Sequence, residues 1–89
     1  MDHPHRVPIE DHLDLHAFAP RDIPSVVEAY IEAAVNAGIH EVRLIHGRGR
    51  GVQRGIVQAT LDRHPNVEEF SDDTASHLGA TLVRLRRTP

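Results

Sequence analysis

The chain has 89 residues, of which 39% are hydrophobic and 26% charged, and its formal net charge is −3 at pH 7. The length fits one globular domain and is too short for two. No stretch of the sequence approaches the roughly 18 apolar residues of a membrane-spanning helix. The negative net charge argues against nucleic-acid binding through a positive overall charge. Cysteine is absent, which excludes disulfides, thiolate zinc sites and cysteine nucleophiles and leads us to expect a cytoplasmic protein.

The chain begins with a polar segment. Residues 1–10 contain Pro4 and Pro8 and have no apolar stretch of the kind found in a signal peptide. We therefore predict a flexible N-terminal arm over residues 1–10 and a single domain over residues 11–87.

Strands and helices are predicted to alternate along the first half of this domain. Leu13 and Leu15 alternate with polar side chains in residues 10–16, as in a half-buried strand. Apolar residues then recur at helical spacing, which predicts a helix over residues 20–37. A short apolar strand is predicted over residues 41–46.

The second half continues this alternation and ends with two strands. A second helix is predicted over residues 52–64, where Pro65 stops it. A strand over 66–70, a polar loop over 71–79 and an alternating strand over 80–87 complete the chain. The order β-α-β-α-β-β predicts the α/β class, and we expect each β-α-β unit to pair its strands in parallel.

A glycine-rich loop joins the strand at 41–46 to the helix that follows it. Glycine permits positive φ and lets a ligand approach the backbone amides, and the helix N-terminus behind the loop favours an anion. Residues 43–54 contain four arginines and no acidic residue, which adds local positive charge. The candidate anion-binding residues are Gly47, Arg48, Gly49, Arg50, Gly51 and Arg54. The alternative is a plain glycine turn with solvated arginines.

Two common phosphate-binding motifs do not fit this loop. A P-loop requires lysine, and the chain contains none. A dinucleotide-binding fingerprint that starts at Gly47 requires glycine at the position of Val52. The loop therefore predicts an anion site of another kind.

Three titratable residues lie at the predicted ends of two strands. Asp14 and His16 share one strand face, so the carboxylate is in a position to orient the imidazole, and His46 ends the next strand. If the two strands are parallel neighbours, both histidines and the glycine loop meet at one edge of the sheet. Histidine exchanges protons near neutral pH, so this edge predicts acid–base chemistry. The alternative is a solvated polar face in a chain with eight histidines.

No residues are predicted to form a metal site. His12, Asp14 and His16 extend over roughly 13 Å along a strand, which is too far for one ion. A Mg²⁺ or Mn²⁺ ion that bridges Asp14 to a phosphate remains open.

Three ordered motifs resemble the Smr (small MutS-related) domain family. They are LDLH at 13–16, IHGRGRG at 45–51 and GATLVRL at 79–85, and the resemblance covers residues 11–87. It implies a two-layer α/β sandwich with a mixed four-stranded sheet, similar to the C-terminal domain of translation initiation factor three. It also implies nucleic acid as a partner, because several family members nick DNA in mismatch repair or in the suppression of recombination, and others cleave RNA.

The resemblance assigns the family's motif positions to individual residues. The first motif falls on Leu13, Asp14 and His16, the second on His46, Gly47, Gly49 and Gly51 around Arg48, and the third on Gly79, Ala80 and Thr81. Two positions depart from the family pattern: Ala17 stands where glycine usually follows the first histidine, and Gln53 replaces an apolar residue.

We expect a small endonuclease that nicks branched DNA or cleaves RNA. His16, oriented by Asp14, would activate the nucleophile, and His46 would protonate the leaving oxygen or hold the phosphate. RNA could supply its own 2′-hydroxyl without metal, whereas water attack on DNA favours a divalent ion.

Two other functions are the alternatives: a non-catalytic nucleic-acid-binding module, or a protein-interaction domain that uses the acidic first helix. The sequence does not resemble the ATPase region of larger family members. We therefore expect a MutS-like or ribosomal partner, if one is needed, to act in trans. No membrane partner is expected, and the oligomeric state is not predicted.

Overall fold

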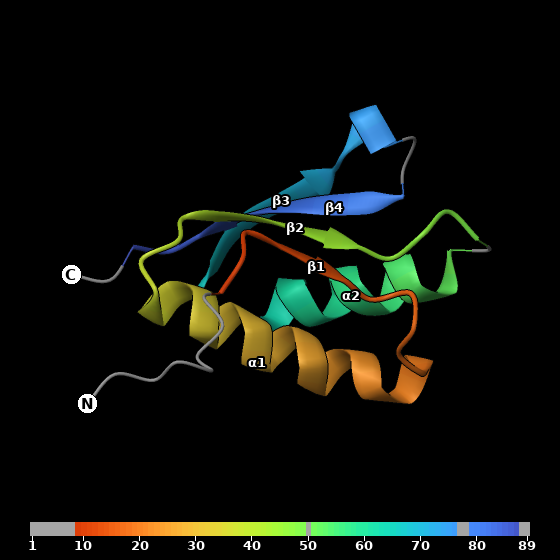
Figure 1. Cartoon of the computed structure of the whole chain (residues 1–89), viewed down its shortest axis with the longest axis horizontal. Helices are drawn as coiled ribbons and strands as arrows, with labels where there is room; N and C mark the ends of the chain where they lie inside the picture. The colour runs from red at the N-terminus through yellow and green to blue at the C-terminus, as the bar shows by residue number, and fades with distance from the viewer. Residues whose placement is uncertain (1–8, 50, 77–78, 88–89) are drawn as a thin grey trace, which may run out of the picture.

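The computed structural model describes residues 9–49, 51–76 and 79–87 (Figure 1). The predicted arm at 1–10 falls almost wholly outside the described residues, and so does Arg50. The elements, in chain order, are β1 (His12–Asp14), η1 (Pro20–Asp22), α1 (Ile23–Asn36), β2 (Glu41–Ile45), α2 (Val52–Arg63), β3 (Val67–Asp72), η2 (Thr74–Ser76) and β4 (Ala80–Leu85).

The structure has two layers, with a four-stranded sheet on one side and both α-helices on the other (Figure 1). The strand order is β1-β2-β4-β3. Within β2, Val42 and Leu44 face the helices and are buried, while Glu41 and Arg43 are exposed on the open face. The predicted α/β sandwich with a mixed sheet is confirmed.

One predicted strand pairing is wrong. β1 and β2 pair in parallel as expected, but β2 and β3 do not pair, because β4 lies between them and is antiparallel to both. The short connection after β3 allows β4 to return alongside it, whereas β2 and β3 are joined only by a long crossover. In this central position β4 buries Val83 and Leu85 against the helices.

The boundaries of the strands differ from the sequence predictions by a few residues. β1 is restricted to His12–Asp14, and β3 extends to Asp72, into the segment expected to be a polar loop. The extension occurs because Ser71 and Asp72 pair with β4, and cross-strand pairing overrides the low strand preference of polar residues.

The first helix forms as the apolar spacing predicts. Ile23, Val27 and Ile31 recur every four residues and are fully buried. The helix ends at Asn36, and Gly38, two residues later, has a φ of 81° in the left-handed region. There the Gly38 N–H donates to the Val35 carbonyl and the Ile39 N–H to an earlier one, each at 3.0 Å, which closes the helix with paired backbone groups. None of the helices in the described ranges is long and apolar enough to cross a membrane.

The pairing of β1 with β2 continues beyond the end of β1. The Leu15 N–H donates to the Ile45 carbonyl at 2.7 Å, and the Leu15 side chain is fully buried in the core. This fixes the chain up to the residue before His16. The two strands therefore leave the sheet side by side and in the same direction.

Candidate functional site

The predicted site residues lie at the edge of the sheet where β1 and β2 end. Asp14 pairs with Ile45 in the parallel register, so His16 and His46 follow at the same edge. Figure 1 shows the loop after β1 and the loop after β2 at the same end of the molecule, beside the start of α2. The strand ends thus meet as the sequence predicts for parallel neighbours.

Asp14 and His16 form a hydrogen-bonded pair at this edge. The His16 Nδ1–H donates to Asp14 Oδ1 at 2.6 Å, and the His16 backbone N–H donates to the same oxygen at 3.0 Å. An ionised carboxylate only accepts, so this bond places the proton on Nδ1 and leaves Nε2 as the free nitrogen. The His16 and Asp14 side chains are 71% and 51% exposed, so a ligand can reach both.

The hydrogen bonds from His16 lower the pKa of Asp14 below its ordinary value of 3.8. The backbone N–H makes the largest contribution and the imidazole the next. A lowered pKa means that the interaction stabilises the fold above the ordinary pKa of the carboxyl and is lost as the pH falls through the lowered value. Asp14 is therefore a carboxylate throughout the neutral range.

We expect His16→Ala to raise the pKa of Asp14 part of the way to 3.8. Only part of the shift is lost, because the backbone N–H of residue 16 remains. A carbon-detected NMR titration of the Asp14 carboxyl measures this change. His12→Ala is the matched control, because His12 contacts Asp11 and Glu10 instead. An unchanged Asp14 pKa in His16→Ala would contradict the pairing.

The glycine loop is bare and open to solvent. Gly47 and Gly51 have φ values of 84° and 81°, a conformation that side-chain-bearing residues rarely adopt. A Cβ placed on Gly47, Gly49 or Gly51 would meet no atom within 4 Å, so the space beside the backbone is empty. The loop therefore leaves room for a ligand close to its amides.

The helix behind the loop contributes further unpaired donors. α2 begins after Gly51 with no side-chain cap and no acidic residue in its first turn. Arg48 is exposed at the loop, and within the described part of the chain it makes no ion pair. The first turn and Arg48 together give this edge the character of an anion site.

His46 is placed differently from His16. It is only 4% exposed, its Nδ1–H donates to the Gly47 carbonyl at 3.0 Å, and its Nε2 lies 2.9 Å from Thr81 Oγ1. The backbone N–H groups of His46 and Gly47 both donate to the Gly79 carbonyl. Since both ring nitrogens are occupied, this geometry favours a role in holding the loop over direct proton transfer to a ligand.

A chain of hydrogen bonds continues from His46 into the sheet and α2. Because the Gly47 carbonyl takes the Nδ1 proton, a neutral His46 accepts at Nε2 from the Thr81 hydroxyl. Gln58 Nε2 in turn donates to Thr81 Oγ1 at 3.2 Å and to Asp72 Oδ1 at 3.0 Å. No buried side-chain polar atom in the described residues lacks a partner. The loop is thus tied to β4, α2 and β3.

Arg54 is occupied at the far end of this chain. Its Nε and Nη2 each donate to a carboxylate oxygen of Asp72 at 2.7 Å. These bonds raise the pKa of Arg54 and lower the pKa of Asp72, which also accepts from Gln58. The sequence predicts Arg54 as a nucleic-acid ligand; in the structure its Nε and Nη2 are paired with Asp72, and 37% of its side chain is exposed.

Several of these supporting residues were not found from the sequence. Thr81 lies in the third motif but had no predicted role, and Gln58 and Asp72 carried no signal because their partners are distant in sequence. Gln53, noted only as a departure from the family pattern, donates through Nε2 to the Phe18 carbonyl at 3.1 Å. This bond joins the loop after His16 to the start of α2.

No metal centre is formed by side chains alone in the described segments. No group of three or more His, Cys, Asp or Glu residues there has the geometry to hold an ion. At the candidate site the Asp14 Oδ1 is already occupied by two hydrogen bonds from His16. A metal ion here would need the ligand's own oxygens.

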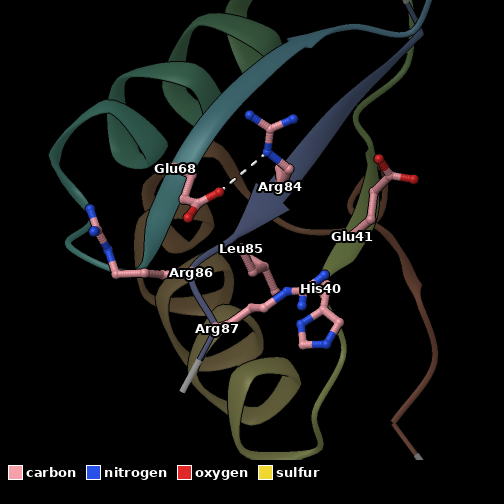
Figure 2. A pocket seen from close by; sticks show the side chains of 7 residues that line it. All are labelled: His40, Glu41, Glu68, Arg84, Leu85, Arg86 and Arg87. Carbon is pink, nitrogen blue, oxygen red and sulfur yellow. Dashed lines mark hydrogen bonds and ion pairs between the residues drawn. The ribbon is translucent and has the colours of Figure 1, made fainter. Parts of the chain in front are cut away.

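A hollow of about 470 Å³ lies at the opposite end of the sheet, where β2 begins and β4 ends (Figure 2). Its charges alternate: Arg84 pairs with Glu68 at 3.3 Å and with Glu69 at 3.0 Å. Arg86 donates to the Pro65 carbonyl. The hollow is lined by residues other than the strand-end histidines and the glycine loop, so it is separate from the candidate site.

Comparison with known proteins agrees with this architecture. The Smr domain model matches residues 13–86. Curated relatives include Endonuclease MutS2 of Caldicellulosiruptor bescii, 35% identical over 88% of this chain, and that of Halalkalibacterium halodurans, 38% identical over 88%. The chain spans about 10% of the length of each relative.

Two solved structures share the fold. The Smr domain of Thermus thermophilus MutS2 has a TM-score of 0.80 and 30% identity, with 86% of this chain and 99% of that chain covered. YdaL, a stand-alone small MutS-related protein from Escherichia coli, has a TM-score of 0.81 and 25% identity, with 93% and 70% covered. The family's sheet and helices therefore recur here almost completely.

Proposed function

The chain belongs to the Smr domain family, and on this premise we propose that it is a nucleic-acid-binding endonuclease that nicks branched DNA or structured RNA. The observation that carries the proposal is the exposed Asp14–His16 pair beside a bare glycine loop at one edge of the sheet. A proton acceptor and an anion site are the two parts that phosphodiester cleavage requires.

In the proposed reaction, His16 Nε2 removes the proton from the attacking hydroxyl. On RNA this is the ribose 2′-hydroxyl, which forms a bond to phosphorus as the bond to the 5′-oxygen breaks. Asp14 holds the imidazole in the tautomer that leaves Nε2 free and stabilises the imidazolium that forms. The departing oxygen takes a proton from solvent at this exposed edge.

The glycine loop and Arg48 stabilise the phosphate while its charge increases. The Gly47 amide is bonded to the Gly79 carbonyl, so the later amides of the loop and those of the first turn of α2 donate to the phosphate oxygens, and the Arg48 guanidinium adds a full positive charge. His46 keeps the loop in shape through the Gly47 carbonyl and contacts no substrate. We therefore assign His46 to positioning.

On DNA the nucleophile must be water, and we propose that Mg²⁺ or Mn²⁺ is then required. The residues present fit such an ion only in part, because Asp14 offers one remaining carboxylate oxygen and the phosphate must supply the other ligands. The ion would lower the pKa of its bound water and add charge beside the phosphate.

The test of the function is cleavage of supercoiled plasmid and of structured RNA by the pure protein, with and without EDTA. We expect nicked plasmid that disappears with EDTA and RNA cleavage that persists with it. If neither nicked plasmid nor cleaved RNA forms in any buffer, the isolated chain has no nuclease activity. Cleavage by the His16→Ala protein at the wild-type rate would exclude the assigned residues only.

Arg48→Ala is expected to reduce the salt dependence of nucleic-acid binding. Each phosphate contact contributes about 0.9 to the slope of log affinity against log salt, so the loss of one contact lowers the slope by roughly one. Titrations at several salt concentrations measure it. Arg63→Ala, an exposed arginine at the far end of α2, is the matched control and should leave the slope unchanged. A wild-type slope near zero would count against nucleic acid as the ligand.

The second candidate function is binding without turnover, and Ala17 is the observation that favours it. Ala17 follows His16 in the exposed turn at the site, where the family pattern has glycine. Its methyl group adds bulk next to the imidazole. If the wild type binds nucleic acid without cleaving it and the Ala17→Gly protein cleaves it, this candidate is supported.

A further inference from the structure

Two large apolar side chains are exposed among the residues that the structure describes: Phe18, at 38%, and Val52, at 58%. Every other large apolar side chain in those ranges is less exposed than these two. Exposed apolar residues scattered singly need no explanation. These two, however, are not scattered, because both lie on the segments that border the candidate site.

Phe18 comes two residues after His16, and Val52 comes directly after Gly51. The two segments are joined, because Gln53 Nε2 donates to the Phe18 carbonyl at 3.1 Å. The Phe18 N–H donates in turn to the Leu15 carbonyl at 3.1 Å. Both polar groups of the Phe18 backbone are thus paired, and Phe18 is anchored beside the glycine loop.

Phe18 lies outside the buried core, with 38% of its surface exposed. The core cluster includes Leu15 and Ile23 on either side of Phe18 in sequence, but it does not include Phe18. Burial of an aromatic ring removes a large apolar area from water. A ligand that covers an exposed ring at a site therefore gains binding free energy from that burial. The ligand that the neighbouring loop fits carries a phosphate, and in nucleic acid each phosphate is flanked by bases.

We propose that Phe18, with Val52 on the adjoining segment, is the surface on which one unpaired base stacks when its phosphate occupies the glycine loop. This subsite rests on the proposed function and narrows the substrate class. A base inside a continuous duplex has both faces covered, so only a bulged, flipped or single-stranded nucleotide can cover the ring. One ring face recognises every base alike, so no sequence preference is expected.

The test uses two duplexes that differ at one position. One carries a single bulged nucleotide and the other an abasic residue at the same bulge. Affinities are measured for the wild type and for Phe18→Ala, Phe18→Leu and Phe18→Tyr. Loss of one stacking contact should weaken binding to the bulged base by about 5- to 150-fold in Phe18→Ala. Phe18→Tyr should retain the wild-type affinity, and Phe18→Leu should fall between the two.

On the abasic bulge, the wild type and Phe18→Ala should bind equally, because no base is present to stack. An equal loss on both duplexes, or no loss on either, overturns the stacking role of Phe18 while the proposed function stands. No binding of either duplex by the wild type overturns both. A wild-type dimer that Phe18→Ala converts to monomer in sedimentation would show that the ring contacts a second copy, and would also overturn the inference.

Discussion

Replacement of His16 by alanine is expected to lower the rate of phosphodiester cleavage by about 10²- to 10⁴-fold, the usual contribution of a positioned general base. Nucleic-acid binding should change little, because the loop amides and Arg48 remain. The prediction follows from the exposed Nε2 of an imidazole whose Nδ1 is held by Asp14 at 2.6 Å. Single-turnover cleavage of RNA and equilibrium binding to the same RNA measure the two quantities separately.

Asp14→Asn is the companion variant. An asparagine oxygen still accepts from Nδ1 and keeps the tautomer, but it no longer balances the imidazolium. We therefore expect an intermediate rate and unchanged binding. If His16→Ala weakens binding as much as it slows cleavage, the imidazole is a ligand-holding group and its assignment as a base is wrong.

His46→Ala is expected to have a different signature, with binding, cleavage and stability all reduced. The buried Thr81 hydroxyl loses its acceptor, although Gln58 still donates to it, and the Gly47 carbonyl loses the imidazole donor, which costs about 1–3 kcal/mol of unfolding free energy. The loop then loses the bond that shapes its first residue. Denaturant unfolding and binding to a phosphate-containing oligonucleotide measure the two effects.

Thr81→Val is the matched variant, because Thr81 is fully buried and bonds the His46 ring. It removes the hydroxyl that bonds His46 Nε2, and it should lower both stability and affinity in the same direction as His46→Ala. Thr81→Ser retains the hydroxyl and should restore much of the affinity. Wild-type stability and binding in His46→Ala, with cleavage alone lost, would instead support direct proton transfer by His46.

The sequence was sufficient for the features that depend on local pattern. The alternation of Leu13 and Leu15 with polar residues predicted which face of the first strand is buried, and both leucines pack in or against the core. The apolar spacing of α1 and the glycines at 47 and 51 likewise predicted a buried helix face and a turn of positive φ. In each case, the residues that specify the feature are neighbours in sequence.

The features that the sequence missed depend on contacts between distant segments. Periodicity gives the buried face of a strand but not its neighbours, so the position of β4 between β2 and β3 was not predicted. Nor does it show that Asp72 captures Arg54, or that Thr81 meets His46 from 35 residues away. In the sequence, His46 and Arg54 cannot be told apart from the exposed His16 and Arg48. Only the fold shows that the side chains of His46 and Arg54 are hydrogen-bonded within the protein.

The central place of β4 also bears on the order in which the domain is completed during synthesis. β4 is the last strand to leave the ribosome, yet β3 pairs with nothing else and the Gly79 carbonyl that anchors the loop directly precedes it. A nascent chain that ends before β4 therefore contains the β1–β2 pair and β3, but lacks the strand that joins them. The edge that carries the candidate site is therefore completed only after the last strand of the domain has been synthesised.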